Sequence, residues 1–271
     1  MAVSRPITKR RTAPGGRASA ARALVQPHTG TITAPPTDLD AIAKRLGVRE
    51  VISADIHADG ELRRRGDGYT IVVSSNQSAA RRRFTLAHEL AHVIVKRSPS
   101  ETASGRELER LCDDIAAELL MPASMFRVDA GPRPDAARIQ RLASRYRTSL
   151  AATAMRCAEL TTISAFEVLD SGVLWQRRIP IPLTKTLVRL IGPSVQRTGT
   201  FETTFEIEEQ NGHRRLQVIG LGSGRSLWLL VPRTVAEQVV QPLLISHRDS
   251  STMPVRLGSS PGRAAALRST R

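Results

Sequence analysis

Residues 88–92 read His-Glu-Leu-Ala-His and carry the side chains best suited to chemistry in this chain. On a helix, residues four positions apart point only about 40° from each other, so the imidazoles of His88 and His92 can reach one ion. Neutral imidazole is a zinc ligand, and a catalytic zinc takes three protein ligands and one water. Glu89 stands beside that water, where its carboxylate can take the water's proton and pass it to a leaving amine. The spacing therefore predicts a metal-dependent hydrolytic site. The alternative is two histidines that only pack on a helix flank.

The third metal ligand is expected from the next helix along the chain. On a helical wheel, Glu109 falls at the edge of the apolar stripe of that helix, and Asp113 lies one turn later on the same side. We expect Glu109 to bind the metal and Asp113 to fix a histidine ring through its other nitrogen. The alternative is that both are ordinary carboxylates at the helix edge. Three other acids of this helix fall on the opposite side, which we expect to face solvent: Glu107, Asp114 and Glu118. Zinc suits this ligand set, and manganese or iron can occupy the same ligands.

The elements that must position these residues are predicted from caps and periodicity. Ser78 can cap the helix that carries the histidines, which runs to about Lys96. The next helix spans residues 106–121 and must stop at Pro122. Upstream, a short helix is expected over 38–46, with Gly47 as its terminal glycine. Three strands follow, at 51–56, 60–64 and 69–75. We expect them to form a small antiparallel sheet above the active-site helix, with an exposed edge that can hold an extended substrate by strand addition.

Two shorter helices, at 134–146 and 150–160, resemble a helix-turn-helix. Four arginines of this pair can meet nucleic-acid phosphates: Arg141, Arg145, Arg147 and Arg156. The alternative, which we favour, is a helical subdomain that closes the underside of the metal site, since DNA readout needs a specific exposed helix.

From residue 163 the periodicity changes from helical to alternating. Strands are expected at 163–169, 173–177, 200–209, 216–221 and 226–231. The glycine-rich segment 220–224 precedes a strand rather than a helix, so we interpret it as a turn and not as a phosphate-binding loop. The region is expected to be mixed α/β, with no ligand motif.

The chain has 271 residues, of which 41% are hydrophobic, enough for one large domain or two small ones. Its apolar runs are far shorter than the ~20 residues of a membrane-spanning helix, which excludes a transmembrane protein. Two cysteines, Cys112 and Cys157, cannot form a disulfide framework and are expected to be reduced and buried. The N-terminal segment lacks the apolar run of a secretory signal. These features predict a cytoplasmic protein.

The net charge of +15 is concentrated at the two ends of the chain. Residues 1–37 hold six basic residues and no acid, and residues 246–271 hold five arginines and one acid. We expect both to be disordered basic arms, with weak nucleic-acid binding as a second role. The expected divisions are an arm at 1–37, the metal-binding domain at 38–133, the helical pair at 134–162, a C-terminal domain at 163–245 and a tail at 246–271.

Three blocks, at residues 82–92, 109–113 and 116–122, resemble the ImmA/IrrE family of zinc metallo-endopeptidases in order and in spacing. The resemblance covers roughly residues 38–178. It implies an α+β, zincin-like metalloprotease domain with a gluzincin-like site, in which His88, His92 and Glu109 hold zinc and Glu89 is the general base. Cys112 stands where the family usually has alanine, and Asp113 where asparagine is common; neither departure changes an inferred ligand.

Some members of this family cleave a repressor of the helix-turn-helix class and so switch on stress or mobile-element genes. The resemblance therefore implies a protein substrate, with such a repressor as the candidate. A shared active site does not fix the substrate, however. We interpret the chain as a zinc-dependent endopeptidase that hydrolyses peptide bonds with a Glu-activated, metal-bound water. The alternative is a DNA-binding transcriptional regulator whose metal site is structural or inactive.

Overall fold

The computed structural model describes residues 14–29, 34–98, 103–170, 172–179, 183–189, 192, 203–209, 212–232 and 254–256. The chain divides into two compact units, one ending at Pro122 and one beginning at Ala123. This division falls 11 residues before the domain boundary that we expect after residue 133. Helix α5 (Ala123–Ala130) contacts the helices that follow it, and the break falls where Pro122 ends the preceding helix.

The sheet of the first unit has three strands, β1 (Val48–Ala54), β2 (Gly60–Arg65) and β3 (Gly68–Ser74). Their order is β1-β3-β2, with β3 antiparallel to β2 but parallel to β1. The prediction of an antiparallel sheet is wrong, because β3 returns between the two earlier strands. Its apolar run, buried from Thr70 to Ser74, is typical of a central strand.

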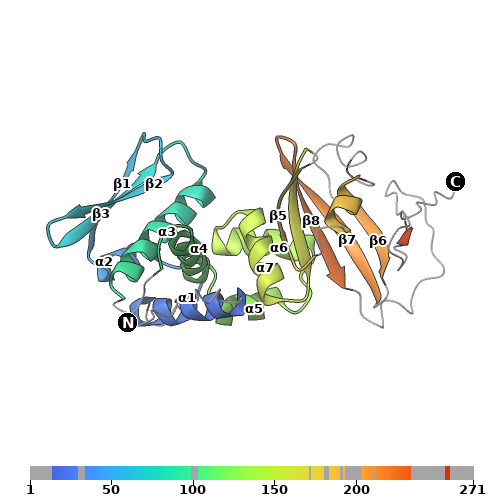
Figure 1. Cartoon of the computed structure of the whole chain (residues 1–271), viewed down its shortest axis with the longest axis horizontal. Coiled ribbons are helices and arrows are strands. Elements are labelled where there is room, and N and C mark those ends of the chain that lie inside the picture. The colour runs from blue at the N-terminus through green and yellow to red at the C-terminus, as the bar shows by residue number, and fades with distance from the viewer. Residues whose placement is uncertain are drawn as a thin grey trace, which may run out of the picture. The chain divides into compact units, whose positions relative to one another are not determined.

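Helices α2 (Leu39–Arg45) and α3 (Ala79–Lys96) pack on this sheet, and α4 (Arg106–Leu120) packs against α3. The predicted N-cap of α3 is confirmed, since Ser78 Oγ accepts a hydrogen bond from the backbone N–H of Arg81 at 3.3 Å. Gly47 ends α2 with a φ of 65°, the left-handed conformation that glycine adopts without strain. Helices α3 and α4 lie side by side (Figure 1), and both carry fully buried leucine and isoleucine side chains.

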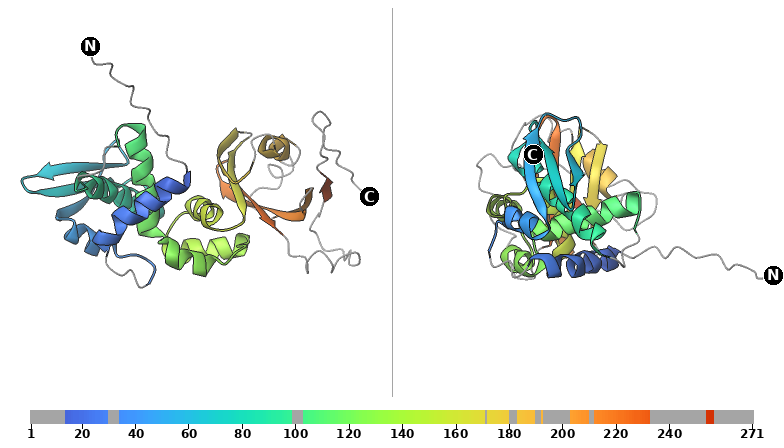
Figure 2. Two further views of the ribbon diagram at one scale, coloured as in Figure 1. Left: turned by 60° about the horizontal axis from the view of Figure 1, so that its bottom comes forward. Right: turned by 90° about the vertical axis from the view of Figure 1, so that its left-hand side faces the viewer.

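Part of the N-terminal arm is ordered. Helix α1 (Pro14–Thr29) packs on α4 (Figure 2), with Ala21 and Val25 buried. The expected disorder of residues 1–37 is therefore wrong for this helix, because two apolar residues four positions apart give it a face to bury. Residues 1–13 lie outside the described part of the chain.

The second unit consists of α5, α6 (Ala136–Tyr146), α7 (Leu150–Leu160) and a six-stranded sheet. The strand order is β5-β4-β8-β7-β6-β9, and every neighbouring pair is antiparallel except β6 and β9. The strands are β4 (Ser164–Leu169), β5 (Gly172–Arg177), β6 (Thr203–Glu209), β7 (Gly212–Gly222), β8 (Arg225–Pro232) and β9 (Pro254–Arg256). Of the segment 220–224 interpreted as a turn, Ser223 and Gly224 form the turn between β7 and β8, whereas residues 220–222 belong to β7. Strand β9 corrects the expectation of a disordered tail for its three residues, and the rest of 246–271 lies outside the described residues.

The sheet of the second unit is covered on both faces. Helices α6 and α7 contact β7, β4, β5 and β8 from one side (Figure 1). An apolar cluster fills the other face, with Phe166 and Trp228 at its centre and their rings 5.3 Å apart. Leu187 and Val188, from a short helical segment at 183–189, close this cluster. The α+β fold class is confirmed. None of the helices in the described ranges combines the length and the apolarity needed to cross a bilayer.

Candidate metal centre

Three predicted ligands converge between α3 and α4. His88 and His92 project from α3, and Glu109 projects from the first turn of α4. One carboxylate oxygen of Glu109 lies 3.3 Å from Nε2 of His88 and 3.8 Å from Nε2 of His92. One ligand atom from each residue fits within a span of 4.8 Å. Two imidazole nitrogens and one carboxylate oxygen this close form a donor set for a divalent metal of the zinc type.

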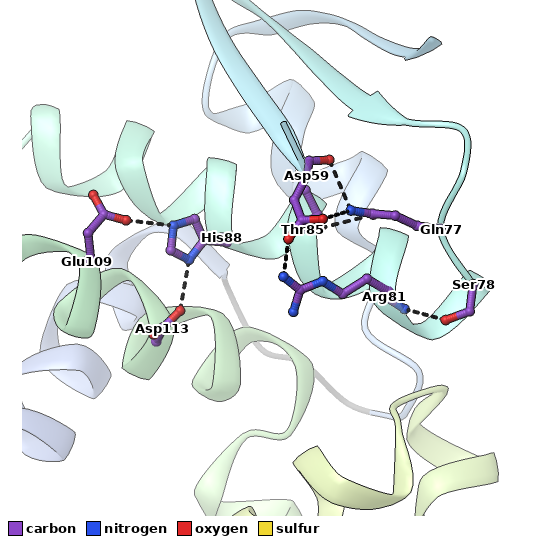
Figure 3. Close-up of polar contacts among 8 residues, drawn as sticks. All are labelled: Asp59, Gln77, Ser78, Arg81, Thr85, His88, Glu109 and Asp113. Carbon is purple, nitrogen blue, oxygen red and sulfur yellow. Dashed lines mark hydrogen bonds and ion pairs between the residues drawn. The ribbon is translucent and has the colours of Figure 1, made fainter. Parts of the chain in front are cut away.

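The other nitrogen of each histidine ring already has a partner. His88 Nδ1 lies 3.0 Å from a carboxylate oxygen of Asp113, as predicted (Figure 3). His92 Nδ1 lies 3.5 Å from Sγ of Cys112, a contact that the sequence did not indicate. Each ring therefore has a partner at Nδ1 and presents its Nε2 to the carboxylate of Glu109, where a metal can bind between them.

The two histidines differ in charge behaviour because their surroundings differ. The hydrogen bond to Asp113 raises the pKa of His88. Burial lowers the pKa of His92, and the neighbouring charge of His88 lowers it further. Burial also raises the pKa of the Cys112 thiol to about 12, which keeps it protonated at neutral pH. The surroundings therefore favour the neutral, metal-binding form of the ring more at His92 than at His88.

The predicted base, Glu89, is buried with 8% of its surface exposed. Desolvation raises its pKa, and the charge of His88 opposes that effect. A carboxylate in such surroundings is a stronger base than one in water, which suits it to accept a proton at neutral pH.

The strand β2 passes directly over Glu89. A Cβ atom at Gly60 would lie 2.5 Å from Cγ2 of Thr85 and 3.0 Å from a carboxylate oxygen of Glu89. Only glycine lets the strand approach the helix this closely. The backbone of β2 therefore runs beside the carboxylate.

The outer edge of β2 is unpaired among the described strands. The N–H of Ser74 on β3 donates to the carbonyl of Asp59, so Asp59 and Ser74 form a hydrogen-bonded pair. Pairs alternate in an antiparallel ladder, and Gly60 is opposite Val73. The backbone N–H and C=O of Gly60 consequently point away from β3, toward the free edge, next to Glu89.

The structure corrects one prediction about Glu118, the carboxylate of α4 that we expected to face solvent. Glu118 does not face solvent but is buried, with 6% of its surface exposed. Its carboxylate lies 3.7 Å from Nε of Arg22 on α1. The helical wheel assigned it correctly to the side opposite the metal site, but the solvent expected there is replaced by α1.

The arginines of the helical pair α6–α7 are unequal. Arg156 is buried, with 4% of its surface exposed, and its guanidinium contacts Glu159 at 3.0 Å. Its predicted contact with phosphate is therefore wrong, because the side chain points into the unit. Arg145 pairs with Asp129 at 3.2 Å. Arg141 and Arg147 are exposed, and Arg147 has a φ of 52° at the turn where glycine is common.

Residues 43–158 match the model of a protein family described as Peptidase_M78, IrrE N-terminal-like domain. Residues 43–158 belong to the ImmA/IrrE family. The matched range contains both helices of the metal centre, and the family carries a metallopeptidase-like domain with peptidase-type activity. No curated protein matches the chain.

Among solved structures, the chain is similar to a Mycobacterium tuberculosis transcriptional regulator. The TM-score is 0.58 at 16% sequence identity, over 89% of this chain and 84% of that chain. At this identity the likeness is one of fold, and it covers much more of the chain than residues 43–158.

Proposed function

We propose that this ImmA/IrrE-family chain is a zinc-dependent endopeptidase of the cytoplasm that cleaves a DNA-binding repressor. One observation carries the peptidase part of the proposal: the three converging ligand atoms lie beside a buried glutamate, beneath a strand with a free edge. A site for metal storage or for structural zinc needs neither the buried base nor the open strand.

The residues present fit the metal that the family implies. His88, His92 and Glu109 would hold it, with Asp113 and Cys112 fixing the two rings. When bound, a divalent metal of this type lowers the pKa of a coordinated water and polarises the carbonyl of the scissile bond.

Glu89 supplies the proton transfers. Its carboxylate accepts the proton of the attacking water and then donates it to the nitrogen of the leaving amine, which completes hydrolysis of the peptide bond. Burial favours this sequence, because the protonated form of Glu89 is more stable there than in water.

The free edge of β2 is suited to hold the substrate. An extended peptide that pairs with the outward N–H and C=O of Gly60 adds a fourth strand to the sheet. Because Gly60 lies against Glu89, such a peptide would present its backbone to the base and the metal ligands. Backbone pairing is indifferent to side chains, so selection of one repressor must come from other contacts.

The decisive experiment is incubation of the zinc-loaded protein with casein and with repressors encoded beside its gene. A regulatory peptidase should cut one repressor at a single site and casein poorly, and the Glu89→Gln variant should cut neither. Rapid casein digestion with every repressor intact would refute the repressor substrate and leave the peptidase mechanism standing. If wild type and Glu89→Gln bind zinc alike and neither cleaves any protein, the peptidase proposal fails.

A further inference from the structure

The beginning of β2 is fastened to α3 by side chains outside the metal centre (Figure 3). Asp59, which directly precedes β2, accepts hydrogen bonds through its carboxylate from the guanidinium of Arg81 and the side-chain amide of Gln77. Its backbone carbonyl accepts from the N–H of Ser74 at 3.0 Å and from Nε2 of Gln77 at 3.3 Å. One residue thus links β2 both to β3 and to the N-terminal end of α3.

The amide of Gln77 extends this connection into the protein. Its nitrogen donates to Asp59, and its oxygen accepts a hydrogen bond from the hydroxyl of Thr85 at 3.2 Å. Thr85 is buried, with 4% of its surface exposed. Because both ends of the amide are used, Gln77 has one orientation, and the chain of contacts runs in order from Asp59 to Thr85.

Two neighbouring stripes of side chains on α3 have different roles at this site. Arg81, Thr85 and Glu89 are spaced four apart, so they follow one side of the helix beneath the start of β2. His88 and His92 form the adjacent stripe, which faces α4. The first stripe therefore holds the strand at one end and carries the base at the other.

The register of β2 matters because its backbone N–H and C=O groups point alternately toward β3 and toward the free edge. A shift of one residue would turn the outward N–H and C=O of Gly60 inward and place a residue with a Cβ atom over Thr85. Neither change is compatible with the close approach of the strand to Glu89.

We infer that Asp59 is a positioning residue: with Gln77 and Arg81 it clamps the first residue of β2 to α3, so that a peptide on the free edge lies in register with Glu89. The inference rests on the proposed function for its role in hydrolysis. The clamp itself is a property of the fold and can be measured without any substrate.

The test compares Asp59→Ala with Asp67→Ala. Asp67 also pairs with an arginine, Arg49, but at the far end of the same hairpin. The first measurement is hydrogen exchange of the amides of Glu61 and Arg63, which belong to the hydrogen-bonded pairs of β2 with β3. We expect faster exchange in Asp59→Ala and little change in Asp67→Ala.

The second measurement is the kinetics of peptide cleavage, with zinc affinity determined on the same samples. We expect Asp59→Ala to lower kcat/KM about tenfold, mainly through KM, at unchanged zinc affinity, because a strand edge that is not held in register binds the peptide less tightly while the base and the metal ligands stay in place. Asp59→Asn, which keeps one acceptor oxygen, should recover part of the loss. Asp67→Ala should match the wild type.

The outcomes separate the clamp from the proposed function. Unchanged exchange in Asp59→Ala would overturn the clamp whatever the activity. Faster exchange with wild-type KM and kcat would overturn the positioning role. Faster exchange in a protein whose wild type cleaves no peptide would support the clamp as a feature of the fold and overturn its part in hydrolysis, together with the proposed function.

Discussion

Glu118 of α4 is buried against Arg22 of α1, with its carboxylate 3.7 Å from the guanidinium Nε. Glu109, on the metal side of the same helix, is exposed at its carboxylate and faces the two histidines. Helix α4 thus carries two glutamates with different roles. Glu118 contacts α1, and Glu109 completes the group of possible metal ligands with His88 and His92.

Substitution of these two glutamates should therefore have opposite effects. We expect Glu109→Ala to lower zinc affinity strongly and to change the thermal stability of the metal-free protein little, since the side chain is exposed. Glu118→Ala should leave zinc affinity near the wild-type value and lower the free energy of unfolding by about 1–3 kcal/mol, because a buried side chain and its contact with the half-exposed Arg22 are lost. Zinc titration and thermal unfolding of both variants decide between them. A loss of zinc affinity confined to Glu118→Ala would show that Glu109 is not the third metal ligand.

Glu89→Gln should bind zinc like the wild type and cleave about 10²- to 10⁴-fold more slowly, because the amide keeps the shape but cannot accept a proton. Metal content and single-turnover cleavage are measured on the same preparation. Glu107→Gln, an exposed acid in the first turn of α4, is the matched control. Normal turnover by zinc-loaded Glu89→Gln would remove this residue from the mechanism.

Gly60→Ala should disturb the site although alanine is compatible with a strand. The added Cβ would lie 2.5 Å from the Thr85 methyl, so the strand or the helix must move. We expect lower stability by about 1–3 kcal/mol and reduced cleavage. The double variant Gly60→Ala/Thr85→Ser removes the methyl, keeps the hydroxyl and should recover part of both. Gly172→Ala is the control, because its Cβ would meet its nearest neighbour at an ordinary 3.5 Å. Equal behaviour of the two alanine variants would contradict the close approach.

The pH dependence of the metal-free protein should report the contact between His88 and Asp113. That hydrogen bond raises the pKa of His88 in the folded state, so protonation of His88 stabilises the fold. This contribution to the free energy of unfolding is fully present below about pH 6.5, the pKa of histidine in the unfolded chain. It is lost as the pH rises through the higher pKa of His88 in the folded protein. Asp113→Asn should lower the pKa of His88 in an NMR titration and reduce stability more at pH 5.5 than at pH 8. A stability difference that is the same at both values would argue against the link.

Removal of Arg156 should destabilise the second unit, whereas removal of Arg141 should not. Arg156 is buried and paired with Glu159, and Arg141 is exposed. We expect Arg156→Ala to lower the free energy of unfolding by about 1–3 kcal/mol and Arg141→Ala to change it by less than about 0.5 kcal/mol. Salt-dependent DNA binding of the two variants tests the alternative function. Binding that is lost only in a folded Arg156→Ala protein would contradict the burial.

The sequence by itself determined the features that depend on local spacing. His88 and His92 share a helix face because they are four residues apart, and Glu109 was separable from Glu118 because a helix has a fixed angle per residue. The caps at Ser78 and Gly47 and the stop at Pro122 follow from backbone chemistry within a few residues.

The tertiary structure alone decided what depends on contacts between distant segments. Strand direction in the first sheet was mispredicted, because alternation along β1 is the same whether its neighbour is parallel or antiparallel. The burial of Glu118 and Arg156 depends on partners that periodicity does not identify. The approach of Gly60 to Thr85 and Glu89 depends on how a strand lies over a helix, and a single glycine in the sequence does not reveal it. The metal ligands can thus be identified from spacing along the chain. The position of a peptide beside Glu89 depends instead on how β2 packs on α3, which involves residues far apart in the sequence.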